Sequence, residues 1–468
     1  MNRFLLGAYH RLPAPARSAV ATLRGLYLRW WRYGPDSERL VRETLERDRW
    51  SRDQWRRWLE ERLARQLERA ATRVPYYREY WTARRRGGDR ASWELLENWP
   101  ILEKEPLRAE PRAFVADDCD IRRMALEQTS GTTGKPLRIW RSRRTVEALH
   151  ALGAARTRGW HGVPAGARWA RLGGQLVVPA SQRQPPFWVW NAALRQLYMS
   201  TYHLAPDLTP HYLDALGRYG IRFLSGYASS LHALANAALE LGRDDLRMLV
   251  AFTSAEPVGN HQRAAISAAF GCAVRETYGM TESVAWASEC EAGRLHQWPE
   301  VGIVEVQDGE LICTGLLNAD MPLIRYRTGD RGRLAAPGST CTCGRALPLL
   351  EAIEGRTTDV LLTRDGRQVF WLNPVWYGMP VREAQIVQET IDRLRVRYAP
   401  APGFAAATAR TVVERLRQRL GEVEVVFEEV LEVPRAANGK LRAVVCNVPL
   451  AEREAALVRP LTSPKSPS

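Results

Sequence analysis

Residues 246–283, LRMLVAFTSAEPVGNHQRAAISAAFGCAVRETYGMTES, pass from an apolar run through a helical stretch and back to an apolar run. The upstream runs ARWARLGG and LHALANAALELG continue this alternation. Because strands that alternate with helices form mainly parallel sheets, we predict an α/β region that begins near residue 120. Nearer the C-terminus, AQIVQETIDRLRVRYAP, TARTVVERLRQRLG and EVEVVFEEVLEVP indicate a strand, a helix and a strand, and hence a small separate α+β domain.

Length and composition indicate a globular protein of more than one domain. The 468 residues are too many for one ordinary core, and 45% hydrophobic with 25% charged residues is typical of folded chains. The net charge of +15 is compatible with an anionic partner. However, all but four of the 67 basic residues are arginines spread along the chain, which favours compositional bias, and no nucleic-acid partner is expected. Since lysine is so rare, a position that needs an ammonium group should be among Lys104, Lys135, Lys440 and Lys465.

The two ends of the chain differ from its middle. Residues 1–70 form a basic, aromatic, helical region, within which Ser51 and Gln54 make a capping box for a helix that ends at Val74-Pro75. We expect this region to pack on the main domain, with contact to an anionic membrane surface as the alternative. No signal peptide or spanning segment is predicted, and seven cysteines argue against a disulfide framework. The expected location is the cytoplasm, with a peripheral position at the inner membrane face as an alternative, and residues 451–468 are predicted to be a disordered tail.

A glycine-rich loop lies in EQTSGTTGKPLRIW, residues 127–140. Gly131 and Gly134 allow positive φ angles, so that successive backbone N–H groups can converge on an anion. The hydroxyls of Ser130, Thr132 and Thr133 add donors, and Lys135 adds positive charge. Such a loop suits a polyphosphate, although an ordinary Gly/Thr turn is the alternative. It is not a Walker A loop, because a proline follows the lysine.

Four further segments follow the loop in order: ETYGMTES at 276–283, YRTGDRG at 326–332, EGRTTDVL at 354–361 and PRAANGKLR at 434–442. With these five motifs the chain resembles the adenylate-forming superfamily of acyl-CoA ligases, luciferases and peptide-synthetase adenylation domains. The nearest likeness is to phenylacetate-CoA ligase-like enzymes, including those associated with capsule and exopolysaccharide synthesis. The resemblance covers roughly residues 70–450. It implies an ATP- and acid-binding domain over 71–354 and a mobile domain over 355–450.

The resemblance also implies a role for each motif. The loop would hold the β- and γ-phosphates of ATP, Tyr278 would stack on adenine, and Thr281 would lie near the α-phosphate. Glu282 would bind Mg²⁺, a hard cation that prefers carboxylate oxygens. Asp330 would accept hydrogen bonds from the ribose hydroxyls, and Arg356 would lie beside ribose or phosphate. The implied cofactor-binding residues are Thr129, Ser130, Gly131, Thr132, Thr133, Gly134, Lys135, Ser254, Ala255, Glu256, Tyr278, Gly279, Asp330 and Arg356, and the implied catalytic residues are Thr281, Glu282 and Lys440.

Lys440 has a chemical rationale of its own. Adenylation requires a carboxylate to attack the α-phosphorus while pyrophosphate leaves, and both reactants are anionic. An ammonium group between them would offset their repulsion and stabilise the transition state. The alternative is a surface lysine after the Asn438-Gly439 turn.

A second constellation is independent of ATP. Cys290 and His296 in ECEAGRLH, with Cys341 and Cys343 in CTCG, provide three thiolates and one imidazole. A Cys₃His set closes a tetrahedral structural zinc site, and simple packing of the thiols is the alternative. Members of the phenylacetate-CoA ligase-like branch carry cysteines in matching places, some of them with zinc. The remaining cysteines, Cys119, Cys272, Cys313 and Cys446, are expected to be packing residues.

The predicted function is ATP-dependent activation of a carboxylic acid to an acyl adenylate, followed by transfer to a thiol, with CoA as the expected acceptor. The chain departs from the family pattern at Thr358 of the hinge, where an acid is usual, and in the segment TRDGRQVFWLNP, which lacks the usual Arg-Gly pair. These departures keep open a second acceptor class: an amine, a sugar hydroxyl or a carrier-protein thiol. A third possibility is a non-enzymatic relative that binds a nucleotide or an anionic polymer.

Overall fold

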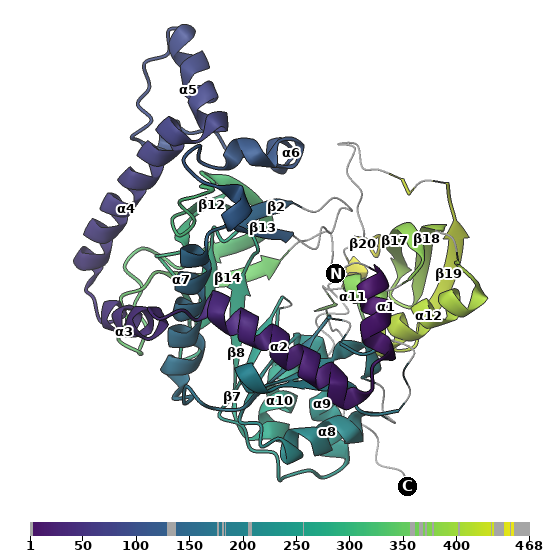
Figure 1. Cartoon of the computed structure of the whole chain (residues 1–468). Coiled ribbons are helices and arrows are strands. Elements are labelled where there is room, and N and C mark those ends of the chain that lie inside the picture. Colours follow the sequence, from purple (N-terminus) through teal and green to yellow (C-terminus); the bar gives the residue numbers. More distant parts are fainter. Residues whose placement is uncertain are drawn as a thin grey trace. The chain divides into compact units, whose positions relative to one another are not determined.

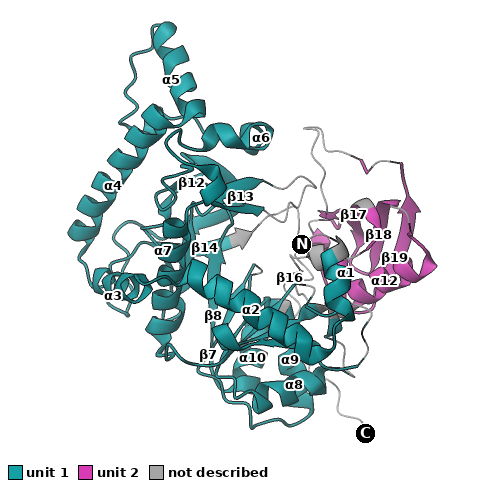
Figure 2. Cartoon of the chain, viewed as in Figure 1, with its two compact units in different colours: residues 1–130, 136–354 teal, residues 131–135, 355–468 magenta. Residues whose placement is uncertain are grey.

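The computed structural model of the chain contains two compact units (Figures 1 and 2). The first unit comprises residues 1–130 and 136–354, and the second comprises 131–135 and 355–468. The described residues are 3–128, 137–175, 177–179, 182, 184–204, 208–255, 257–355, 361–364, 368–369, 372–376, 379–400, 403–431, 433–434, 444–449 and 451–453. None of the described helices is long and apolar enough to cross a membrane.

A 12-stranded sheet forms the centre of the first unit, and its middle is parallel as predicted. The parallel strands lie in the order β8-β7-β6-β3-β5, and β6 to β8 are joined through helices α9 and α10. Their bounds are β3 (Trp169–Gly173), β5 (Gln196–Ser200), β6 (Phe223–Gly226), β7 (Val250–Ser254), β8 (Ala273–Gly279), α8 (Thr209–Arg218), α9 (Ala228–Glu240) and α10 (Asn260–Phe270). The side chains of Leu224, Leu234 and Phe270 are fully buried in the core between this part of the sheet and its helices. This arrangement confirms the predicted α/β class.

The flanks of the sheet are antiparallel, which the alternation of strands and helices did not predict. They consist of β4 (Trp188–Asn191), β9 (Trp286–Glu289), β10 (Leu295–Gln297), β11 (Gly302–Gln307), β12 (Glu310–Gly315), β13 (Tyr326–Leu334) and β14 (Leu349–Gly355). These strands are antiparallel because some of the loops that join them are too short for the crossover that a parallel pair needs. Asp308 and Gly309 both have positive φ and join β11 to β12 in a tight hairpin, whereas a parallel pair would need a crossover.

The N-terminal helices pack on this unit. They are α1 (Arg3–Arg11), α2 (Ala14–Arg32), α3 (Ser37–Arg47), α4 (Arg52–Arg73) and α5 (Pro75–Arg86), followed by α6 (Lys104–Ala109) and α7 (Arg143–Gly153). The capping box of Ser51 and Gln54 is confirmed, and α4 ends before the extended Val74, which precedes proline. The buried guanidinium of Arg156 binds the carboxylates of Asp48 and Glu300, each at 2.8 Å, and so fixes the end of α3.

The second unit has its own sheet and its own core. The strands β17 (Val381–Thr390), β18 (Arg393–Pro400), β19 (Glu424–Glu429) and β20 (Val444–Cys446) lie in the order β19-β18-β17-β20, with α12 (Ala406–Leu420) between β18 and β19 in the chain. Short elements precede them: β15 (Leu361–Leu362), β16 (Gln368–Val369) and α11 (Asn373–Trp376). The α+β class is confirmed, but AQIVQETIDRLRVRYAP forms two strands, not one. Its turn at residues 391–392 is too short to interrupt the apolar pattern.

Candidate active site and metal centre

Four of the predicted nucleotide-binding residues lie at the carboxyl ends of the parallel strands β7 and β8. Ser254 ends β7 and is followed by Ala255, whose φ is 65°, while Tyr278 and Gly279 end the neighbouring strand β8. A Cβ atom at Gly279 would come within 2.5 Å of the Trp286 ring, so the strand end requires glycine. The carboxyl ends of parallel strands are the usual place for ligands in α/β sheets.

Asp330 of β13 lies at the carboxyl end of β8, although β14, β10 and β9 separate β13 from β8 in the sheet. The Tyr278 hydroxyl donates a hydrogen bond of 3.0 Å to Oδ2 of Asp330, so the antiparallel part of the sheet must curl toward β8. Burial, followed by the Asp330 carboxylate, raises the pKa of Tyr278 well above its usual value, so the phenol remains a donor. The two residues predicted to contact adenine and ribose are therefore adjacent.

Glu282 is held from a third direction. The hydroxyl of Tyr326, the first residue of β13, donates a hydrogen bond of 2.9 Å to Oε1 of Glu282, and both side chains are buried. Next to Glu282, Ser283 has a positive φ of 54°, and its hydroxyl accepts a hydrogen bond of 3.0 Å from Nη1 of Arg141. Thr281, one residue before Glu282, lies in the same turn after β8. A carboxylate fixed at one oxygen in this way is suited to present the other oxygen to a cation.

The glycine-rich loop is bracketed by two strands, β1 (Ala125–Gln128) and β2 (Arg138–Arg141), which pair antiparallel with Gln128 opposite Arg138. The loop residues 129–135, together with Glu256, Arg356 and Lys440, lie outside the described residues, and their roles stay predictions. The bracketing strands are tied to the site, because Arg141 of β2 contacts Ser283 and also forms an ion pair with Glu127 of β1. Burial lowers the pKa of Arg141 to about 10, and the nearby Glu282 carboxylate opposes this.

Three residues that touch the site were not predicted from the sequence. Tyr326 is the first residue of the YRTGDRG motif, and its place in that motif could have indicated a role. Lys104 belongs to the small set of lysines, and its ammonium donates a hydrogen bond of 2.6 Å to the carbonyl of Thr328, two residues before Asp330. Arg141 gave no signal, because it is one arginine among many.

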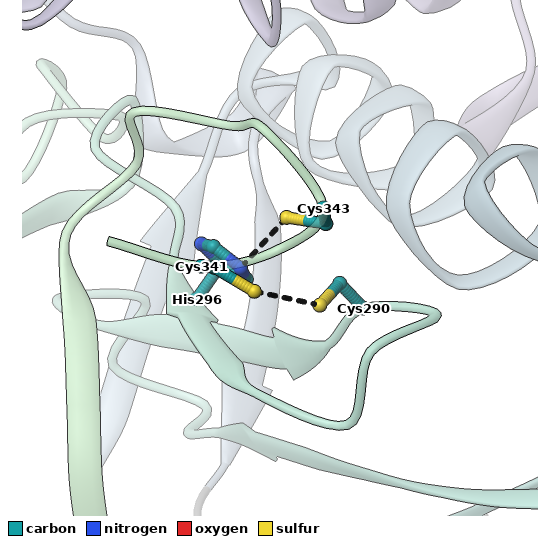
Figure 3. Close-up of side chains that lie close together, drawn as sticks. All are labelled: Cys290, His296, Cys341 and Cys343. Carbon is teal, nitrogen blue, oxygen red and sulfur yellow. Dashed lines mark hydrogen bonds between the residues drawn. The ribbon is translucent and has the colours of Figure 1, made fainter.

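The structure brings the predicted zinc ligands together, although they come from two segments about 45 residues apart in the chain (Figure 3). The ligand atoms of Cys290, His296, Cys341 and Cys343 all lie within 4.8 Å of one another. The Sγ atoms of Cys290 and Cys341 are 3.6 Å apart, and Sγ of Cys343 is 3.3 Å from Nε2 of His296. Around a tetrahedral zinc with Zn–S bonds of about 2.3 Å, two sulfurs are separated by about 3.8 Å. The donor types and the spacing therefore fit a zinc ion.

The pKa directions in the cluster indicate what a bound cation would have to supply. Burial lowers the pKa of His296 to about 4, so its imidazole is neutral and can offer a lone pair. Burial raises the pKa of the Cys290 thiol to about 12, so a thiolate at this position needs positive charge beside it. If a metal were bound, the four protein ligands would close its coordination sphere and leave no open position for catalysis.

Comparison with known proteins gives two family matches that divide the chain as the two units do. Residues 95–305 match the AMP-binding enzyme family, and residues 361–447 match the CapK C-terminal domain. Protein CapK of Staphylococcus aureus is 27% identical over 311 residues, which cover 62% of this chain and 67% of that protein. A phenylacetate-coenzyme A ligase of Thermus thermophilus is 25% identical over 469 residues, covering 88% of this chain and 99% of that protein.

Among solved structures, the fold is similar to that of a 2-hydroxyisobutyryl-CoA ligase in complex with 2-HIB-AMP and CoA. The TM-score is 0.58 at 20% sequence identity, with 88% of this chain and 93% of that chain covered. The fold, the site at the carboxyl ends of β7 and β8, and the two family matches define the class: the chain belongs to the adenylate-forming superfamily. Within that superfamily it is phenylacetate-CoA ligase-like, an enzyme of the AMP-forming acid–thiol ligase type.

Proposed function

We propose that the chain activates a carboxylic acid with ATP and transfers the acyl group to the thiol of CoA. The observation that carries this proposal is that β13 meets the end of β8 twice: Tyr278 donates a hydrogen bond of 3.0 Å to Asp330, and Tyr326 donates one of 2.9 Å to Glu282. A stacking ring, a ribose acceptor and a metal-binding carboxylate are the parts that a bound MgATP requires.

The first step joins the acid to AMP. A carboxylate oxygen of the substrate forms a bond to the α-phosphorus, the bond to the bridging oxygen breaks, and pyrophosphate leaves. Glu282 would hold Mg²⁺, which would neutralise charge on the phosphates. The loop from Thr129 to Lys135 binds the β- and γ-phosphates, and Lys440 places its ammonium between the carboxylate and the α-phosphate.

The second step releases AMP. The sulfur of CoA attacks the acyl carbon of the adenylate, the thiol proton is lost, and the mixed anhydride bond to AMP breaks. We propose that residues 355–450 move between the two steps, with Arg356 just after the boundary at Glu354, so that one site can serve two geometries.

We propose a structural role for zinc at Cys290, His296, Cys341 and Cys343. The segment that holds the last two ligands leads directly into β14, which borders β10 in the sheet. A metal at this point would hold the β9–β10 turn to that segment and thereby stabilise the antiparallel flank that carries β13 and Asp330.

A screen of carboxylic acids with ATP, with and without CoA, tests the function. Formation of AMP and an acyl-CoA, both identified by mass spectrometry, is the expected result for at least one acid. Asp330→Asn should raise KM for ATP, because a neutral amide oxygen is a weaker acceptor for the ribose hydroxyls. Absence of acid-dependent AMP formation across aryl, fatty and hydroxy acids would refute the proposal.

A second acceptor class is our alternative proposal. Residues 361–447 match the CapK C-terminal domain, a family apart from the one that matches residues 95–305, and we propose that this part of the chain determines the acceptor. If the same screen gives pyrophosphate and an acyl adenylate but no thioester when CoA is added, the acceptor is an amine, a hydroxyl or a carrier protein.

A further inference from the structure

Helix α2 covers the free edge of the large sheet with one of its faces. The edge strand β4 would otherwise expose backbone groups, and the side chains of α2 satisfy several of them. The Ser18 hydroxyl accepts a hydrogen bond of 3.2 Å from the backbone N–H of Trp190, and Thr22 accepts one of 3.1 Å from that of Ala192. Gly25 lies so close to Asn191 that a Cβ atom would overlap its side chain. One face of α2 is therefore fixed against the protein.

The opposite face of α2 is apolar and exposed. At 3.6 residues per turn, Val20, Leu23, Tyr27 and Trp30 fall on one stripe that points away from β4. Between 41% and 67% of the surface of each of these residues is exposed, and Leu26 beside them is 53% exposed. Figure 1 shows α2 running along the outside of the first unit. A large apolar stripe of this kind requires a partner.

The positive charge beside the stripe indicates which kind of partner binds this face of α2. Residues 1–34 contain Arg3, Arg11, Arg17, Arg24, Arg29 and Arg32 and neither Asp nor Glu, although Arg17 is buried and donates a hydrogen bond of 2.9 Å to Gln182. On the helix, the exposed Arg24 borders the stripe on one side, whereas Arg29 lies on the face of Ser18 and Thr22. Arg143 of α7 stacks over the Trp30 ring at 4.2 Å and adds another cation at the same end.

From these observations we infer that the outer face of α2 docks on an anionic membrane surface. An apolar stripe that includes Tyr and Trp, with Arg24 along one edge and Arg143 at its end, is typical of helices that lie in the plane of the lipid headgroups. Two signals, apolar burial and attraction to anionic lipid, then act together, and neither requires a spanning segment. Since the stripe lies outside the nucleotide site, this inference is independent of the proposed catalytic function.

Flotation of the full-length protein with vesicles tests the inference. Vesicles of phosphatidylcholine with about one third phosphatidylglycerol should bind the protein, vesicles of phosphatidylcholine alone should bind it far less, and high salt should weaken the binding. Leu23→Glu with Tyr27→Glu should lower the apparent partition coefficient by at least about tenfold. The matched control is Leu239→Glu with Leu241→Glu, which makes the same change at exposed apolar residues at the end of α9 and should have no effect.

A second variant keeps the inference testable if the first variant does not fold. Arg24→Gln keeps the apolar stripe and should reduce binding to the anionic vesicles by about fivefold. Thermal unfolding should show that both variants are folded. Absence of vesicle binding, equal binding to neutral vesicles, or insensitivity to both variants would overturn the inference. A dimer in light scattering that Leu23→Glu dissociates, without any lipid binding, would assign the face to a second copy of the chain instead.

Discussion

Replacing Tyr326 with phenylalanine tests how Glu282 is held. The change removes a single hydroxyl, which donates the 2.9 Å hydrogen bond to Oε1 of Glu282, and leaves the fully buried ring in place. A hydrogen bond to a charged group contributes about 1.5–3 kcal/mol. If this bond positions the carboxylate that binds Mg²⁺, its loss should raise the half-saturating Mg²⁺ concentration or lower kcat by about 10- to 100-fold.

The assay is pyrophosphate release as a function of Mg²⁺ concentration. Tyr77→Phe is the matched control, because Tyr77 is equally buried and its hydroxyl accepts a hydrogen bond of 3.0 Å from a backbone group, the Ile324 N–H, instead of donating to a carboxylate. Both variants should lose some stability, but only Tyr326→Phe should change the Mg²⁺ response. Equal Mg²⁺ curves for the two variants would refute the positioning role of Tyr326.

Three other predictions concern the metal cluster, Lys104 and a buried acid. Cys341→Ser should abolish the binding of one zinc per chain in metal analysis and lower the Tm, whereas Cys272→Ser, also buried but outside the cluster, should keep its zinc. Lys104→Met should raise KM for ATP by about tenfold, because the ammonium no longer holds the Thr328 carbonyl and the turn that carries Asp330; an unchanged KM would show that the turn holds itself. Burial and the neighbouring Glu289 carboxylate raise the pKa of Glu276 from 4.5 to about 8. Since the folded state then binds more protons than the unfolded state between these two values, this carboxyl destabilises the fold progressively as the pH rises, and Glu276→Gln should raise the Tm at pH 8 but not near pH 4.

The parallel centre of the fold could be predicted because its signal is local. Each apolar run such as VAFTS of β7 is buried, and each following helix has its own periodicity and its own end, as at Gly271 with a φ of 59° after α10. The antiparallel flank could not be predicted in the same way. Its short strands are joined by turns as small as Asp308-Gly309, and the curl that brings β13 to β8 depends on contacts between residues far apart in the chain.

The candidate site, like the fold, could be predicted where the signal is local and could not where it depends on contacts between distant residues. The residue types of Tyr278, Glu282 and Asp330 could be identified from their motifs, but their mutual contacts could not, since Asp330 is 52 residues from Tyr278. Tyr326 acts on Glu282 across 44 residues, and neither residue signals the other in the sequence. The Cys₃His set was readable because sulfur and imidazole are rare in this chain, whereas Arg141 was hidden by the abundance of arginine.

Exchange of labelled pyrophosphate into ATP is the most direct test of whether the glycine-rich loop and Lys440 act on the same triphosphate. With an acid that the enzyme accepts, the wild-type chain should catalyse acid-dependent exchange, and Lys440→Ala should lower its rate by at least about 100-fold, since a transition-state charge partner is lost. Lys465→Ala, which removes a lysine outside every motif, should exchange like the wild type. Exchange that is unchanged in Lys440→Ala, or that requires no acid, would contradict adenylate formation by this site.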